Sequence, residues 1–240
     1  MTQEQVAAII NAPIPLTTDT YTPITHKDVI VNINRTLEGC GIKPIESYIT
    51  SSNNHQLMNG KFVFDEGSDG DVQMALDFRN SYNKRYAAEV RATTNVKICS
   101  NGLMIPLHEV SFKRKHTGSN AVSDFDERVK QAIDYMPTVY AQALTVKERT
   151  GNVDMTPDQM YELAGWLYGQ GIMTTPMFSE TIREIDNPTF GKFGYNNNDS
   201  LWDMYNHCTL AMKKSTPDKV YERHDQLTSL ISDRYALELV

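Results

Sequence analysis

The chain has 240 residues and a formal net charge of −7, with 40% hydrophobic and 22% charged residues. This length and composition predict a soluble globular protein, and no run approaches the ~18–20 apolar residues that a membrane helix needs. The acidic balance works against unspecific binding to nucleic acid or membrane, so a polyanion would have to bind locally.

The three cysteines, Cys40, Cys99 and Cys208, are odd in number and widely spaced. This usage indicates a reducing compartment and argues against a disulfide framework. The first six residues lack the basic region and the apolar core of a secretory signal. We therefore expect a protein of the host cell cytoplasm.

Residues 1–24 predict an extended N-terminal arm with one short helix from Gln5 to Ile10. Three prolines, Pro13, Pro15 and Pro23, fix the backbone angle φ and disfavour longer regular structure. The arm could be mobile, or it could wrap a neighbouring subunit.

A helix is predicted from Thr25 to Leu37. Thr25 is a suitable N-cap, and Ile30, Ile33 and Leu37 form one apolar stripe at helical spacing. Gly39 and Gly41 favour its termination.

Between Ile45 and His116 the pattern predicts an antiparallel β-meander. Asn59-Gly60 lies between apolar pairs and predicts a hairpin turn. The predicted strands are 45–50, 72–79, 86–93, 96–105 and 110–115, together with the two arms of that hairpin.

From Ser123 the apolar spacing becomes helical, and Pro137 is expected to kink or split the first helix. Thr156, Thr175 and Ser200 mark further helix starts, and a last helix should begin near Ser215 and run to about Tyr235. Four aromatic residues at helical spacing are expected in the core: Trp166, Tyr168, Trp202 and Tyr205.

The expected fold class is therefore α+β, an antiparallel meander at about 45–116 preceded by one helix and followed by a helical C-terminal half. We expect three parts: the arm at 1–24, the helix and sheet at 25–122, and the helical half at 123–240, packed on the sheet as one domain.

Enzymatic motifs are weak in this sequence. Cys99 could form a thiolate with His108 or His116, but it lies in an apolar run where a buried cysteine is usual. No residues show zinc-site spacing, a phosphate-binding loop or an ordered calcium loop. We expect no catalytic residue, metal or cofactor, and a thiol or metal enzyme using Cys99 or His116 stays an alternative.

The segment from Arg79 to His116 is basic. Its eight lysines and arginines outweigh two glutamates, so it carries +6 while the rest of the chain carries −13. Cations with nearby aromatic rings on a sheet suit single-stranded nucleic acid, because phosphates take the charges and bases stack on the rings. The alternative is a solvated edge strand that lysines protect from aggregation.

Within the last strand of this segment, alternation places Ser111, Lys113 and Lys115 on one face and Phe112, Arg114 and His116 on the other. The predicted nucleic-acid-binding residues are seven cations and three aromatic residues: Arg79, Lys84, Arg85, Arg91, Lys113, Arg114, Lys115, Tyr82, Tyr86 and Phe112.

Three motifs carry a resemblance to a known family: Asn80-Ser-Tyr-Asn83, Val96-x-Ile-Cys-Ser-Asn-Gly-Leu103 and Lys115-His-Thr-Gly118. With the helix start Leu201–Thr209, they resemble the phage- and plasmid-encoded proteins grouped as domain of unknown function 932. Many members have Asp-Gly where this chain has Asn83-Lys84. The resemblance implies a mobile-element gene and a cytoplasmic product, and it implies no catalytic residues.

We therefore expect a non-enzymatic phage or plasmid protein that binds single-stranded DNA or RNA, in annealing or recombination, as a homo-oligomer away from membranes. In outline the predicted fold resembles phage single-strand annealing proteins, which is an argument from analogy. The alternative is a protein-interaction role, as a virion component or an antagonist of a host defence protein.

Overall fold

The computed structural model describes residues 3–65, 72–96, 101–103, 111–189, 199–216 and 219–239. The architecture is α+β, as predicted, with an antiparallel meander and a helical C-terminal half. Contacts divide the chain into two compact units. The first comprises Met1–Ser68, Met74–Thr93 and His108–Val139, and the second comprises Asp69–Gln73, Thr94–Leu107 and Tyr140–Val240.

The first unit opens with two helices, α1 (Gln3–Ile10) and α2 (His26–Gly39). Thr25 caps α2 as predicted: its side chain accepts from the Asp28 amide, and the Asp28 carboxylate accepts from the Thr25 amide. The apolar stripe of α2 is buried, with Ile33 and Leu37 at most 1% exposed. Because cap and stripe are both local signals, the sequence was sufficient to place this helix.

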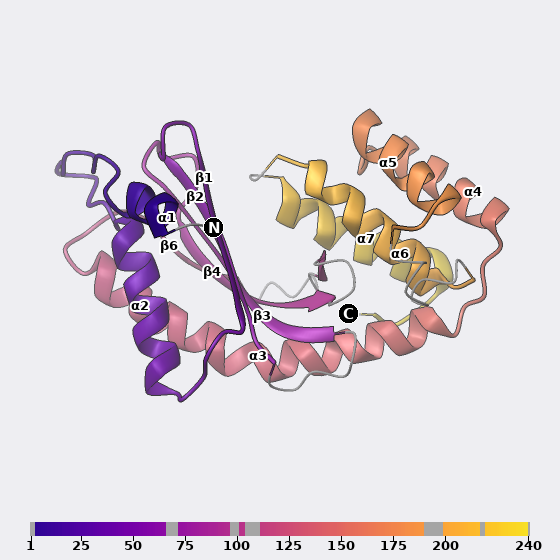
Figure 1. Ribbon diagram of the computed structural model, residues 1–240, viewed down its shortest axis with the longest axis horizontal. Helices are drawn as coiled ribbons and strands as arrows, with labels where there is room; N and C mark the ends of the chain where they lie inside the picture. The colour runs from indigo at the N-terminus through magenta and orange to yellow at the C-terminus, as the bar shows by residue number, and fades with distance from the viewer. Residues whose placement is uncertain are drawn as a thin grey trace. The chain divides into compact units, whose positions relative to one another are not determined.

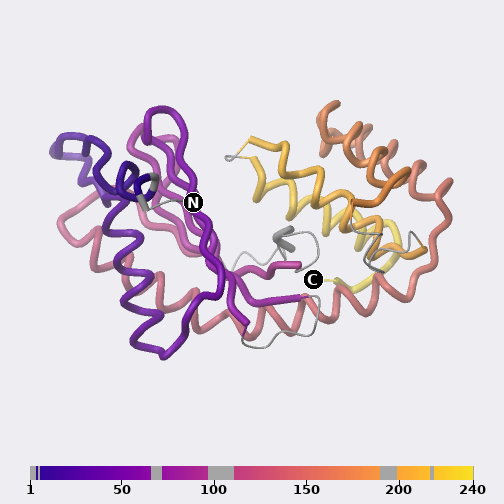
Figure 2. The backbone as a smooth tube through the Cα atoms, viewed as in Figure 1, coloured from indigo at the N-terminus to yellow at the C-terminus, as the bar shows by residue number. Residues whose placement is uncertain are grey.

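The sheet runs in chain order through β1 (Glu46–Ser52), β2 (Leu57–Val63), β3 (Val72–Ser81) and β4 (Ala88–Val96). Figure 2 follows the chain back and forth through the first three strands. The far edge of β4 pairs at its start with β6 (Ser111–Arg114) and at its end with β5 (Asn101–Leu103). The predicted meander is therefore confirmed.

The two faces of the sheet differ in chemistry. On one face Phe78 is fully buried, and the Phe112 ring meets Tyr135 of the long helix α3 (Ala121–Gly151) at 5.8 Å. Within the first unit, α2 and the start of α3 lie on this side (Figure 1). The opposite face carries ion pairs, Lys61–Asp77 at 3.4 Å and Arg79–Glu89 at 2.6 Å.

The predicted turn at Asn59-Gly60 is wrong, because both residues lie inside β2. The chain reverses instead at Asn53, Asn54 and His55, which all have positive φ. Gly60 has a packing role: a Cβ there would lie 2.1 Å from the Phe78 ring on the neighbouring strand. The glycine therefore makes room for an aromatic side chain across the sheet.

The helices from α3 onward largely follow the prediction. Pro137 lies inside α3, which is not split in two. The later helices are α4 (Pro157–Gly169), α5 (Thr175–Asp186), α6 (Leu201–Ala211), the 3₁₀ turn η3 (Met212–Lys214) and α7 (Val220–Tyr235). Thr156 and Ser200 form capping boxes, whereas Thr174 rather than Thr175 occupies the N-cap of α5.

The prediction that four aromatic residues lie in the core holds for only one of them. Tyr205 is fully buried, and its hydroxyl is 2.5 Å from the Thr228 hydroxyl. Trp166 and Trp202 are half-buried, and Tyr168 is 43% exposed. Among the residues that the structure describes, no helix combines the length and apolar character needed to cross a bilayer.

Replacing Gly60 with alanine should destabilise the protein by about 1–3 kcal/mol, because the new methyl group collides with a fully buried ring. Urea unfolding followed by circular dichroism measures this loss. The matched control is Gly165→Ala, since nothing lies within 4 Å of a Cβ at this exposed helical position. That change should raise the free energy of unfolding by up to about 1 kcal/mol.

Candidate nucleic-acid interface

A groove of about 330 Å³ lies in the first unit, where three segments that are distant in sequence meet. The N-terminal segment contributes Thr20 and Tyr21, and the loop between β3 and β4 contributes Lys84, Tyr86 and Ala87. The segment that directly follows β6 contributes Lys115, His116 and Thr117. The groove therefore joins part of the predicted basic segment to the N-terminal arm.

The N-terminal segment is held on the sheet by His116. The Thr22 amide donates to the His116 carbonyl at 2.8 Å, and the Ile24 amide donates to His116 Nδ1 at 2.9 Å. The rings of Tyr21 and His116 stack with centroids 5.5 Å apart. Tyr21 and Ile24 are 6% and 0% exposed, so this part of the predicted arm is packed in the fold.

Residues of the Asn80–Asn83 motif hold the same segment from the other side. Asn80 Nδ2 donates to the Ile24 carbonyl at 2.9 Å, and the Tyr82 hydroxyl accepts from the His26 amide at 2.8 Å. The rings of His26 and Tyr82 stack at 3.9 Å. These contacts give the motif a structural role as the docking site of residues 24–26.

The loop that presents Lys84 is closed by one serine. Ser81 Oγ donates to the Tyr86 carbonyl at 2.6 Å and accepts from the Tyr86 amide at 3.0 Å. Lys84 lies within this loop with φ of 61°, in the left-handed region. Its ammonium group lies 4.9 Å from the centre of the Tyr21 ring, a cation–π distance.

Four of the seven predicted cations are exposed: Lys84, Arg85, Lys113 and Lys115. Lys113 lies 3.7 Å from Glu89, which also binds Arg79. Lys84 and Lys115 both line the groove, and among the described residues neither forms an ion pair with a carboxylate. These two lysines therefore provide the available positive charge of the groove.

The other three cations require a correction, because the fold uses their charges internally. Arg79 and Arg91 are only 8% and 3% exposed, on the face of the sheet that also holds Glu89 and Asp77. Burial raises the pKa of Asp77, while the nearby charges of Lys61 and Arg91 lower it. Arg114 donates to Asp124 at 2.9 Å and to the Thr117 carbonyl at 2.9 Å.

Two of the three predicted stacking residues are also occupied. Tyr82 is 5% exposed against His26, and Phe112 packs edge-on against Tyr135. Tyr86 is half-buried beside Arg79 and lines the groove. Sequence reasoning missed Tyr21, because nothing in the proline-rich arm indicated that it folds back beside His116.

His116 lines the groove as an uncharged side chain. Burial lowers its pKa to about 4, so the ring is neutral at pH 7. Because Nδ1 accepts the Ile24 amide, Nε2 carries the proton, and in the described structure it has no hydrogen-bond partner. Burial likewise lowers the pKa of His26 to about 4.

The alternative of thiol chemistry at Cys99 is not tested by the structure, because Cys99 and His108 lie outside the described residues. Cys208 is buried, and burial raises the pKa of its thiol. A search of the described ranges finds no group of three metal-ligating side chains.

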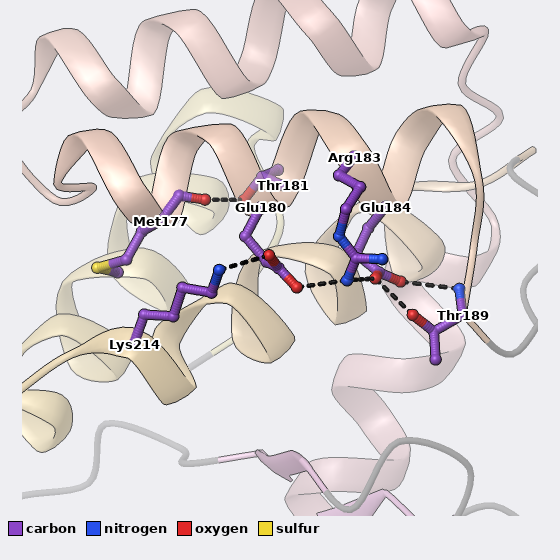
Figure 3. Close-up of polar contacts among 7 residues, drawn as sticks. All are labelled: Met177, Glu180, Thr181, Arg183, Glu184, Thr189 and Lys214. Carbon is purple, nitrogen blue, oxygen red and sulfur yellow. Dashed lines mark hydrogen bonds and ion pairs between the residues drawn. The ribbon is translucent and has the colours of Figure 1, made fainter.

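A second polar cluster lies in the second unit, and its charged side chains pair with one another (Figure 3). Glu184 is 1% exposed and accepts from Arg183 at 2.7 Å and from the Thr189 amide at 2.9 Å. Arg183 and Lys214 also bind Glu180 and lower its pKa to about 2. The cluster therefore ties α5 to Thr189 and η3, a structural role.

Comparisons with protein-family models, with curated proteins and with solved structures found no match. The resemblance to domain of unknown function 932 therefore stays a prediction.

Acid should weaken the docking of the N-terminal segment. Since the pKa of His116 is about 4 in the folded protein and near 6.5 unfolded, the stabilisation is complete above about pH 6.5 and is lost as pH falls towards 4. His116→Asn keeps an acceptor for the Ile24 amide but cannot titrate. Thermal unfolding followed by circular dichroism should show a smaller fall in Tm between pH 6.5 and 4.5 for this variant. Since carboxylates titrate alike in both proteins, an equal fall would contradict this role.

Proposed function

We propose that the protein binds single-stranded nucleic acid through the groove between the N-terminal segment, the β3–β4 loop and the segment that directly follows β6. The observation that carries this proposal is the convergence of two exposed lysines, Lys84 and Lys115, with the half-buried Tyr86 on one groove. Lysines supply charge for phosphates, and aromatic rings supply surfaces for bases.

The charge of the groove is local, as the overall acidity of the chain requires. Glu89, an acidic residue of the neighbouring sheet, already binds Arg79, Lys113 and the Ser111 hydroxyl. Its charge is therefore balanced without Lys84 or Lys115. Exposed Lys113 and Arg85 extend the cationic surface beyond the groove.

The aromatic lining favours unpaired bases over a duplex. Bases in a duplex are already stacked on one another, whereas a single strand can turn a base onto a tyrosine. An origin in a phage or plasmid belongs to this proposal through the resemblance of the motifs. A part in annealing or recombination belongs to it through the outline likeness of the fold to phage single-strand annealing proteins, an argument from analogy. The alternative is that the same lysines pair with an acidic protein surface, a role that leaves the position of Tyr86 in the groove unexplained.

Binding is tested by fluorescence anisotropy with a labelled oligothymidine of about 15 nucleotides. The double variant Lys84→Glu, Lys115→Glu should lower affinity at least about tenfold. Because each phosphate contact contributes roughly 0.7 to the slope of log K against log salt, the variant should reduce that slope by about 1.4.

The matched control is Lys43→Glu, Lys130→Glu, which changes the net charge equally at exposed lysines outside the groove. It should bind nearly as well as the wild type. Tyr86→Leu should weaken binding by about 1–3 kcal/mol without changing the salt slope, because stacking carries no charge. No binding at low salt, or equal loss in the control, would reject the proposal and favour the protein-interaction role.

A further inference from the structure

Strand β1 is an edge of the sheet with one side unpaired by any other described strand. The Phe64 amide donates to the Met74 carbonyl, and the Tyr82 amide donates to the Gln56 carbonyl. The backbone amides and carbonyls of even-numbered residues in β2 therefore point towards β3. The backbone groups of odd-numbered residues in β2 point towards β1, where they pair with even-numbered residues. By alternation, Ser47, Ile49 and Ser51 direct their amides and carbonyls to the open edge.

A second groove, of about 500 Å³, borders β1 in the first unit. It is lined by four consecutive residues of β1, Tyr48–Ser51, together with Ala8 and Ile9 of α1 and with His55. None of these side chains carries a formal charge at pH 7. An unprotected edge beside an apolar groove is a surface to which an extended segment can add as a further strand.

The chain itself offers a segment that fits this surface. Residues 13–17, Pro-Ile-Pro-Leu-Thr, have no regular structure and carry two exposed apolar side chains, Ile14 at 55% and Leu16 at 88%. In an extended chain, the residues of one parity direct their amides to one side. Pro13 and Pro15 would therefore point away from the ladder, while Ile14 and Leu16 offer amides to it.

We propose that residues 13–17 of one copy add to the β1 edge of a second copy, so that two chains exchange their N-terminal arms. Pairing of Ile14 and Leu16 with Ser47, Ile49 or Ser51 loses no donor to proline. The prolines close the outer side of the added strand, which prevents further strands from joining.

The geometry favours a second copy as the occupant. Ile9 lines the groove, and Ile14 follows five residues later, at most about 17 Å along the chain. The segment that would be exchanged and the strand edge that would receive it thus lie close together in each copy, which suits reciprocal exchange about a two-fold axis. Residues 13–17 and the residues that line the groove include no carboxylate, lysine or arginine, so no like charges oppose their contact.

Sedimentation velocity of the full-length protein, without nucleic acid, tests the arm exchange over concentrations up to about 100 µM. The wild type should form dimers. Leu16→Asp places a charge at the contact, and Ser47→Pro removes an outward amide while leaving the β1–β2 ladder intact. Each should raise the dimer dissociation constant at least about tenfold.

The control variant is Val31→Asp, which charges another exposed apolar residue, 46% exposed, on α2. It should dimerise like the wild type, and unchanged circular dichroism should show that all variants fold. A monomeric wild type, or dimers that tolerate Leu16→Asp and Ser47→Pro, would overturn the proposal. Because no nucleic acid is present, these results are independent of the binding function.

Discussion

The groove depends on the docking of residues 21–26 onto the sheet, with one neutral histidine at its centre. His116 accepts the Ile24 amide through its side chain and the Thr22 amide through its carbonyl, while its ring stacks on Tyr21. A charged imidazole could not accept the Ile24 amide, because both of its nitrogens would be donors. The burial that keeps this ring neutral is therefore also what maintains the groove.

Burial also divides the basic segment into structural and available charge. Arg79 and Arg91 lie buried near carboxylates, where removing one partner would leave a poorly solvated charge behind, and Arg114 binds Asp124 at the surface. Lys84 and Lys115 remain at the surface, beside the groove. The buried arginines thus stabilise the sheet, whereas the exposed lysines lie at its surface. The positive charge accessible to a ligand is therefore smaller than the net charge of the segment.

The sequence predicted those features that depend on neighbouring residues. The capping boxes at Thr25, Thr156 and Ser200 and the alternation of the strands are local, and the fold class followed from them. The prediction of a turn at Asn59-Gly60 failed because Gly60 lies within a strand, where it makes room for Phe78 across the sheet. The burial of the arginines and the place of Tyr21 likewise depend on chain segments that meet only in the folded protein.

Lys84 occupies a backbone conformation that suits glycine, with φ of 61°. A side chain in the left-handed region costs about 1 kcal/mol. Glycine would relieve the strain and remove the ammonium group from the groove. Lysine at this position therefore lowers conformational stability while it adds a positive charge to the groove, and a screen for thermostable variants would tend to discard it.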